Sequence, residues 1–238
     1  MSNYLEIIIP VFNEDQTILK SIETIFENLD LSFMITICYD FDEDTTLKAI
    51  NNSSFKDSDK IRFVKNIKSG PHSAVMTGIY NSKANHVLVM PADDEHNAII
   101  IKNMYKLAIE ESYDIVCPSR FMVGGSMVGA PLVKKLLVIT ANYTLRKFAR
   151  LPVDDATNGF RLFSRNVIDN INITSKHGFA YSIEYLVKSH RKGFKITQIP
   201  SNWRERKSGK SRFKVYSWFF YYLRWYVYAL ITRLKKFL

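Results

Sequence analysis

The stretch NHVLVMPADDEHN, residues 85–97, combines a short apolar run with a cluster of acids. Four apolar residues from Val87 onward lead toward Asp93, Asp94 and Glu95. Like charges at this density repel one another, so a bound cation or a special local geometry has to offset the repulsion. A solvated loop that opens a helix is the alternative, because acids in a first helical turn suit the helix dipole. The stretch alone leaves both interpretations open, but its apolar half is typical of a buried strand.

Apolar runs of similar length recur on both sides of this stretch, separated by segments with helical spacing. The runs cover residues 4–11, 33–40, 60–66, 85–93 and 113–120, and the helical segments cover 15–29, 43–50, 72–83 and 97–111. Short apolar strands that alternate with helices indicate βαβ units and a mostly parallel sheet with both faces covered. We therefore expect an α/β fold, with one domain over residues 1–212 and an amphipathic helical segment over 213–238.

Polar and charged residues follow several of these runs. In an open parallel sheet, ligands bind at the carboxyl ends of the strands. No G-x-G-x-x-G follows the first run and no G-x-x-x-x-G-K-[ST] occurs, so neither a dinucleotide site nor a Walker-type site is indicated. The residues expected at this edge are Pro10, Phe12 and Glu14 after the first run, Asp40 after the second, Asp93 and Glu95 after the fourth, and Arg120 after the fifth.

Charge is distributed unevenly along the chain. The formal net charge is +10, yet residues 188–238 contain 14 Lys and Arg and a single acid, Glu205. A nearly neutral body with a basic C-terminal fifth indicates an anionic partner at that end. Aromatic residues interleaved with the cations favour an anionic membrane surface, and we expect no nucleic-acid partner.

Cysteine usage and the N-terminal sequence indicate a reducing compartment. Cys38 and Cys117 both lie inside apolar runs, as expected for core thiols. The opening MSNYLEIII lacks the basic segment of a signal peptide. We therefore expect a cytoplasmic location.

Six segments occur in an order that resembles family 2 glycosyltransferases. They are IIIPVFNE (7–14), CYDFDEDTT (38–46), SGPHSAVMTGI (69–79), VMPADDEHN (89–97), PSRF (118–121) and DATNGFRLFSR (155–165). The chain is most similar to the branch that contains dolichyl-phosphate mannose synthases and bacterial polyprenyl-phosphate glycosyltransferases. The resemblance implies a GT-A (Rossmann-like) fold and inverting transfer of a hexose from a nucleotide sugar of the GDP-mannose or UDP-glucose type. It also implies a divalent cation, Mg²⁺ or Mn²⁺.

The resemblance assigns roles to the residues at the expected edge. Pro10, Phe12, Glu14 and Asp40 match the nucleotide-binding positions. Asp93 matches the last Asp of the D-x-D motif that holds the cation, and Glu95 matches a second cation-proximal position. Arg120 matches an arginine that neutralises phosphate charge.

Two positions depart from the family pattern. The first Asp of D-x-D is Pro91, and the usual Asp-Asp pair after the second strand is Tyr39-Asp40. A hard cation can still bind through one or two carboxylates together with substrate phosphates and waters. Metal dependence therefore remains the expectation.

Two features indicate the acceptor: a missing catalytic base and a cluster of basic residues. Where many family members have a Glu-Asp pair with a catalytic base, this chain has Glu184-Tyr185. A phosphate monoester is already anionic at pH 7 and needs no base, only cations that position it. The segment WRERKSGKSRF (203–213) resembles the branch's R-x-x-G-x-S-K motif. Its predicted acceptor-phosphate residues are Arg204, Arg206, Lys210, Ser211 and Arg212, and the predicted catalytic residues are Asp93, Arg120, Arg206 and Arg212.

Two apolar segments with basic residues follow a different pattern from the strands. Placed on a helix, 213–238 has a polar stripe on an otherwise aromatic and aliphatic surface, and no uncharged run long enough to span a bilayer. The stripe consists of Lys214, Ser217, Tyr221, Arg224, Tyr228, Thr232 and Lys235. Residues 131–151 form a second candidate, for which a dimer face or ordinary core is equally open, so a homo-oligomer is possible. We expect a peripheral protein at the inner face of the cell membrane that uses a polyprenyl phosphate.

Two alternatives stay open at this point. One is a glycosyltransferase that uses a saccharide hydroxyl as acceptor in cell-envelope polysaccharide synthesis. The other is a non-catalytic nucleotide-sugar-binding relative, suggested by Pro91 and Tyr39.

Overall fold

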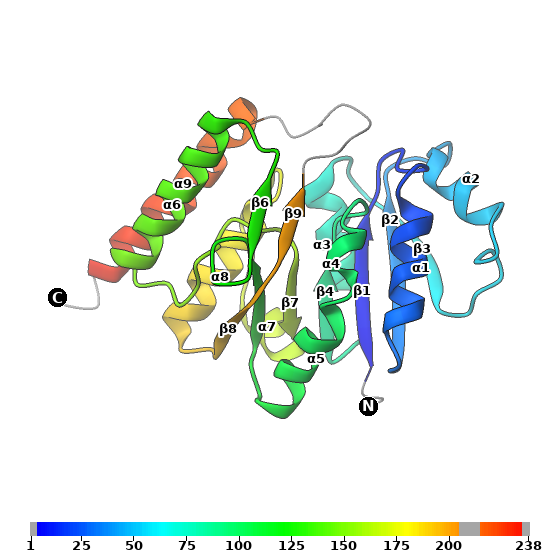
Figure 1. Cartoon of the computed structure of the whole chain (residues 1–238), viewed down its shortest axis with the longest axis horizontal. Coiled ribbons are helices and arrows are strands. Elements are labelled where there is room, and N and C mark those ends of the chain that lie inside the picture. Colours follow the sequence, from blue (N-terminus) through cyan, green and yellow to red (C-terminus); the bar gives the residue numbers. More distant parts are fainter. Residues whose placement is uncertain (1–3, 205–214, 235–238) are drawn as a thin grey trace.

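The computed structural model describes residues 4–204 and 215–234, which form a central sheet with helices on both faces (Figure 1). The strands are β1 (Leu5–Pro10), β2 (Phe33–Tyr39), β3 (Ile61–Lys65), β4 (His86–Val89), β5 (Ile115–Ser119), β6 (Ser126–Val128), β7 (Arg161–Ser164), β8 (Ile196–Pro200) and β9 (Asn202–Arg204). The helices are α1 (Ile18–Asn28), α2 (Thr45–Asn51), α3 (Pro71–Asn81), α4 (Glu95–Ala98), α5 (Ile101–Glu110), α6 (Leu132–Lys147), α7 (Arg165–Asn170), α8 (Ala180–Lys192) and α9 (Val215–Leu234).

The main sheet has seven strands in the order β3-β2-β1-β4-β7-β5-β8. Its pairs are parallel except for β7, which runs antiparallel to both β4 and β5. A separate two-stranded ribbon joins β6 and β9 in parallel. The prediction of a mostly parallel α/β sheet is therefore confirmed, and β7 is an addition that the alternating pattern did not indicate.

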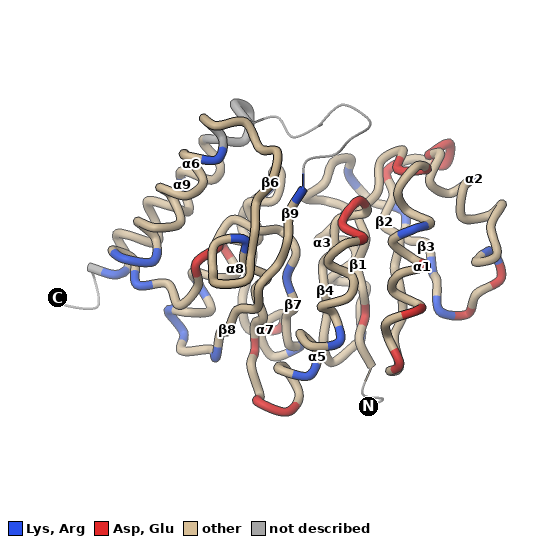
Figure 2. The backbone as a smooth tube through the Cα atoms, viewed as in Figure 1, with Lys and Arg blue, Asp and Glu red and all other residues tan. Residues whose placement is uncertain are grey.

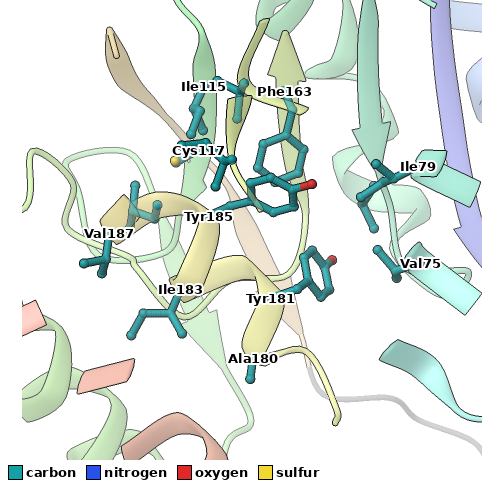
Figure 3. Packing of buried hydrophobic residues seen from close by; sticks show 14 of the residues in the cluster. Val75, Ile79, Ile115, Cys117, Phe163, Ala180, Tyr181, Ile183, Tyr185 and Val187 are labelled. Atoms are coloured by element: carbon teal, nitrogen blue, oxygen red, sulfur yellow. The ribbon is translucent and has the colours of Figure 1, made fainter. Parts of the chain in front are cut away.

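The sheet separates two hydrophobic layers. On one face, Ile7 and Ile9 of β1 pack with the inner sides of α1 and α5. On the other face, Val87 and Val89 of β4 pack with α3, α8 and α9. Figure 3 shows the second layer, where Tyr181 and Tyr185 of α8 project toward Val75 and Ile79 of α3. Cys38 and Cys117 are buried free thiols, as predicted.

Helix α9 is part of this packing. It contacts α8 and α6, and it contributes Trp225 and Ala229 to the core. Its exposed side includes Arg224 and Tyr228 of the predicted polar stripe but also Phe220 and other apolar residues. Within residues 4–204 and 215–234, the structure has no helix with both the length and the apolar character that crossing a membrane requires.

Candidate active site

The acidic turn, residues 93–95, directly follows β4. The backbone N–H of Met90 donates to the carbonyl of Ile8 at 2.9 Å, so the strand ladder holds the start of the turn. Asp93, Asp94 and Glu95 are all half-buried. Burial raises the pKa of Asp94 to about 7, and the neighbouring Asp93 and Glu95 add to the effect. Three adjacent half-buried carboxyl groups make each other costly to ionise, and a bound cation would offset that cost.

Asn97 connects the acidic turn to β9. Its side-chain amide donates to the Asp94 carboxylate at 2.6 Å and to the carbonyl of Asn202 at 2.9 Å, while its Oδ1 accepts from the Asn202 N–H at 3.0 Å. The side chain is almost fully buried. Asn97 was not among the residues predicted from the sequence, because a single amide between an acidic turn and an apolar run changes no pattern. The consequence is that the strand ending in Arg204 is anchored beside the acidic turn.

The predicted acceptor residues divide into two groups. Arg204 is exposed on β9, in register with Val128 of β6. The other four, Arg206, Lys210, Ser211 and Arg212, lie outside the described residues. Their roles remain predictions, but the segment that carries them starts from the anchored strand.

Asp40 joins three elements at the carboxyl edge. Its Oδ1 accepts from the Asn66 side chain at 2.8 Å, and its Oδ2 accepts from the backbone N–H of Gly70 at 2.9 Å. Gly70 has φ +108°, a conformation that favours glycine. The carboxylate thus links the ends of β2 and β3 to the start of α3, and its role toward a nucleotide stays a prediction.

The loop after β1 is held by Asp44, which sequence reasoning did not single out. Asp44 is fully buried and accepts from the backbone N–H of Asn13 at 3.0 and 3.1 Å and from that of Thr46 at 2.8 Å. Asn13 returns the contact, because its Oδ1 accepts from the Thr45 N–H at 3.0 Å. This network positions residues 12–14 against the start of α2. An aspartate followed by two threonines is the available signal, since Asp44 also caps α2.

The predicted nucleotide-binding residues lie along this fixed loop. Pro10 ends β1, paired with Cys38 of β2, and Glu14 is held through its N–H, which donates to the Thr46 hydroxyl at 2.9 Å. Phe12 is 44% exposed, and its ring contacts Phe41 edge-on at a centroid distance of 5.4 Å. An aromatic ring this exposed is not core packing, which leaves it accessible to a base or ribose.

Arg120 forms a buried ion pair with Asp155. Its Nε donates to Oδ2 at 2.6 Å and its Nη2 donates to Oδ1 at 2.9 Å, with a further bond to the Thr157 hydroxyl at 3.1 Å. Burial opposes the positive charge, but Asp155 and, more weakly, Asp94 hold the pKa of Arg120 above its ordinary value. The Arg120 guanidinium is therefore paired with Asp155 and also interacts electrostatically with Asp94 of the acidic turn. A role toward phosphate stays a prediction.

The donor set for a cation consists of the predicted ligands Asp93 and Glu95. Across the described ranges, no three carboxylate, histidine or cysteine side chains come together as a self-sufficient metal cage. Mg²⁺ is usually bound by one or two carboxylates, with phosphates and waters completing the shell. Two half-buried carboxylates on one turn fit that pattern, provided that the substrate diphosphate supplies further ligands.

Glu184, at the position of the family's Glu-Asp pair, is a structural carboxylate. It is fully buried and accepts from the backbone N–H groups of Thr174 and Ser175, each at 2.7 Å, and from Lys188 at 2.5 Å. Burial alone would raise its pKa, but the Lys188 and backbone hydrogen bonds hold that pKa below its ordinary value. Glu184 is thus engaged by protein donors, and the position where the family pattern has the base is occupied by Tyr185.

Glu184→Gln is expected to lower the free energy of unfolding by about 3 kcal/mol at pH 7, because the new amide nitrogen faces backbone N–H donors. A lowered folded-state pKa means that the carboxylate's stabilisation is complete above the unfolded-state pKa, near 4.3, and is lost as the pH falls below it. Urea denaturation should show the difference between wild type and variant shrinking from about pH 5 to pH 3. The exposed Glu110→Gln is the control, and a pH-independent difference for Glu184→Gln would contradict the assignment.

Known structures and sequences identify the class of protein. The fold matches glucosyl-3-phosphoglycerate synthase from Mycobacterium tuberculosis in complex with UDP, with a TM-score of 0.71 and 15% identity over 98% of this chain and 80% of that one. The same synthase with Mn²⁺, UDP and glucosyl-3-phosphoglycerate matches with a TM-score of 0.69 and 16% identity over the same shares. The fold is therefore that of the GT-A glycosyltransferases.

The profile of glycosyl transferase family 2 matches residues 6–171, and the chain belongs to this family. The chain is 28% identical to the dolichol-phosphate mannosyltransferase of Pyrococcus furiosus, over 98% of this chain and 67% of that one. It is 24% identical to the polyprenol monophosphomannose synthase of Mycolicibacterium smegmatis, over 87% of this chain and 79% of that one. The chain is a glycosyltransferase, which disfavours the non-catalytic alternative.

Proposed function

We propose that the protein transfers a hexose, with inversion, from a nucleotide sugar of the GDP-mannose or UDP-glucose type to a polyprenyl phosphate. The observation that carries the proposal is the bond network of Asn97, which joins the acidic turn to the strand that leads into the basic segment. Asn97 would thereby hold the predicted donor-diphosphate site, at the acidic turn, next to the strand that leads into the predicted acceptor-phosphate site. The names of the two curated relatives support the lipid acceptor.

The chemistry follows from the charges at this edge. An acceptor phosphate oxygen attacks the anomeric carbon, and the bond from that carbon to the diphosphate breaks with its electron pair leaving on the diphosphate. No proton has to move, so the engagement of Glu184 does not impede the reaction. Asp93 and Glu95 would hold Mg²⁺ or Mn²⁺, whose Lewis acidity would stabilise the departing diphosphate. The exposed Phe12 and the loop fixed by Asp44 would orient the base and ribose.

The test uses radiolabelled nucleotide sugars with extracted membrane lipid, with and without Mn²⁺. Metal-dependent label in an organic-soluble, acid-labile product is the expected result. Label found only in water-soluble glycan would favour the saccharide-hydroxyl alternative instead. A thermal-shift screen of nucleotide sugars identifies the donor, because a ligand at 100 times its Kd stabilises the folded state by about 2.7 kcal/mol.

Arg206→Ala and Arg212→Ala are expected to raise the KM for polyprenyl phosphate by about 10- to 100-fold, the value of one charge-assisted hydrogen bond. Donor binding, measured by calorimetry, should change less than about twofold, since the donor contacts lie on other strand ends. Lys207→Ala is the control, because it removes the same charge from the same segment at a position outside the motif. Equal losses in donor and acceptor binding would contradict the assignment.

A further inference from the structure

Helices α6 and α9 lie side by side at one end of the molecule and form a single unit (Figure 1). The Tyr226 hydroxyl of α9 donates to the Thr144 hydroxyl of α6 at 2.8 Å. Arg191, near the end of α8, donates to the carbonyl of Ala149 at 2.9 Å and to that of Ala229 at 2.8 Å. These bonds join the same ends of both helices, so α6 and α9 run in the same direction and are fixed to each other.

Both helices are apolar on two sides. Their inner sides are in the core, through Leu145 of α6 and through Trp225 and Ala229 of α9. Their outer sides expose Leu132 at 84%, Leu136 at 67% and, on α9, Phe220 at 72%. Thirteen of the 21 exposed large apolar side chains in the described part of the chain lie on α9 or within 132–148. A concentration of exposed apolar side chains of this kind marks an interaction surface.

The charges on this face all have the same sign. Neither residues 131–151 nor residues 213–238 contain an Asp or Glu. Lys135 and Lys147 are exposed on α6, and Arg224 is exposed on α9. Figure 2 shows Lys and Arg gathered where α6 and α9 end, with no acidic residue on either helix. One neighbouring acid, Asp154, is already paired with Arg146 at 2.7 Å.

We propose that α6 and α9 together form a face that docks on a bilayer containing acidic phospholipid. The apolar side chains would enter the interface, and the lysines and arginines at its rim would contact acidic headgroups. A second copy of the chain is a poorer occupant, because pairing this face with itself would bring cation against cation. The proposal rests on the proposed function and deepens it, since a lipid acceptor has to be reached at a membrane surface. In this proposal α6 contributes as much to membrane contact as α9 does.

The first test is co-sedimentation of the whole chain with vesicles of phosphatidylcholine alone and of phosphatidylcholine mixed with phosphatidylglycerol. Binding at least about tenfold stronger to the acidic vesicles, and weaker at high salt, is the expected result. No binding to either vesicle, or equal binding to both, would overturn the proposal.

The second test compares two paired variants. Lys135→Gln with Leu136→Ser on α6 should weaken binding to acidic vesicles on the order of 50-fold, about tenfold from the leucine and about fivefold from the lysine. Lys106→Gln with Ile109→Ser on the outer side of α5 is the matched control and should leave binding unchanged. Equal losses in both variants would overturn the proposal, as would a wild-type dimer that the α6 variant converts to monomer.

A third measurement separates this proposal from the proposed function. Transfer to a water-soluble, short-chain polyprenyl phosphate should be the same for wild type and the α6 variant, because that acceptor does not require docking. A loss of this activity in a folded α6 variant would mean that the face acts in chemistry and would overturn docking as its role. A wild type that binds acidic vesicles but transfers no sugar to any polyprenyl phosphate would refute the proposed function and leave the docking face standing.

Discussion

Asp93→Asn is expected to reduce kcat/KM for sugar transfer by about a thousandfold, equivalent to about 4 kcal/mol of transition-state stabilisation. The substitution keeps the shape of the side chain but removes the charge that would hold the cation against the donor diphosphate. Steady-state kinetics at saturating Mn²⁺ measure the loss. The variant should unfold at the same temperature as wild type, because Asp93 is only half-buried.

Asp94→Asn is the matched control for this prediction. Asp94 lies next to Asp93, but its carboxylate accepts from the Asn97 side chain at 2.6 Å, a bond that an asparagine oxygen also accepts. We expect its kcat/KM to fall less than about tenfold. Similar losses in the two variants would show that the acidic turn acts as a whole and would contradict the choice of Asp93, rather than Asp94, as a metal ligand.

Arg120→Ala is expected to lower the free energy of unfolding by about 3–5 kcal/mol, the cost of leaving a buried charge without its partner. Asp155 is fully buried and its two oxygens accept from the Arg120 guanidinium at 2.6 and 2.9 Å. For a chain of this length the melting temperature should fall by about 10 °C. Urea denaturation of Arg120→Ala, of Asp155→Ala and of the double variant measures the coupling free energy between Arg120 and Asp155.

A second Arg–Asp pair in the same molecule provides the control. Arg146 and Asp154 are 2.7 Å apart, but their side chains are 50% and 26% exposed. Arg146→Ala should therefore cost less than about 1 kcal/mol. If Arg120→Ala instead kept its stability and lost only catalysis, the arginine would act on substrate phosphate, as the sequence resemblance implies, and the ion pair would be of minor importance.

Much of the architecture could be predicted from local patterns. The apolar runs at 4–11, 33–40, 60–66 and 85–93 became β1 to β4 because a strand buried on both faces requires continuous apolar sequence. The position of Asp40 and of the acidic turn at one edge followed from parallel topology alone. The helix expected over 97–111 is instead two helices, α4 and α5, with Ile99 and Ile100 between them.

The long-range hydrogen bonds that shape the site could not be predicted from local patterns. Asn97 meets Asn202 across 105 positions of sequence, and Asp44 meets Asn13 across 31. A single polar residue that pairs over such a distance changes no periodicity, so its partner stays unknown until the fold is seen. The same limit applied to 131–151, because an apolar pattern with paired basic residues is compatible with core, interface or membrane contact until burial is measured.

The antiparallel strand β7 has a consequence for how the chain is made. Among the strands of residues 4–204, β7 alone links the half of the sheet formed by β3, β2, β1 and β4 to the half formed by β5 and β8. On a translating ribosome, β5 emerges before β7 and β8, the two strands that flank it. Until β7 is made, the backbone N–H and C=O groups of β5 have no partner strand, and one edge of β4 is also unpaired. A nascent chain arrested before residue 161 should therefore be cut readily by protease within β5, and the protection of β5 should begin only once β7 has left the exit tunnel.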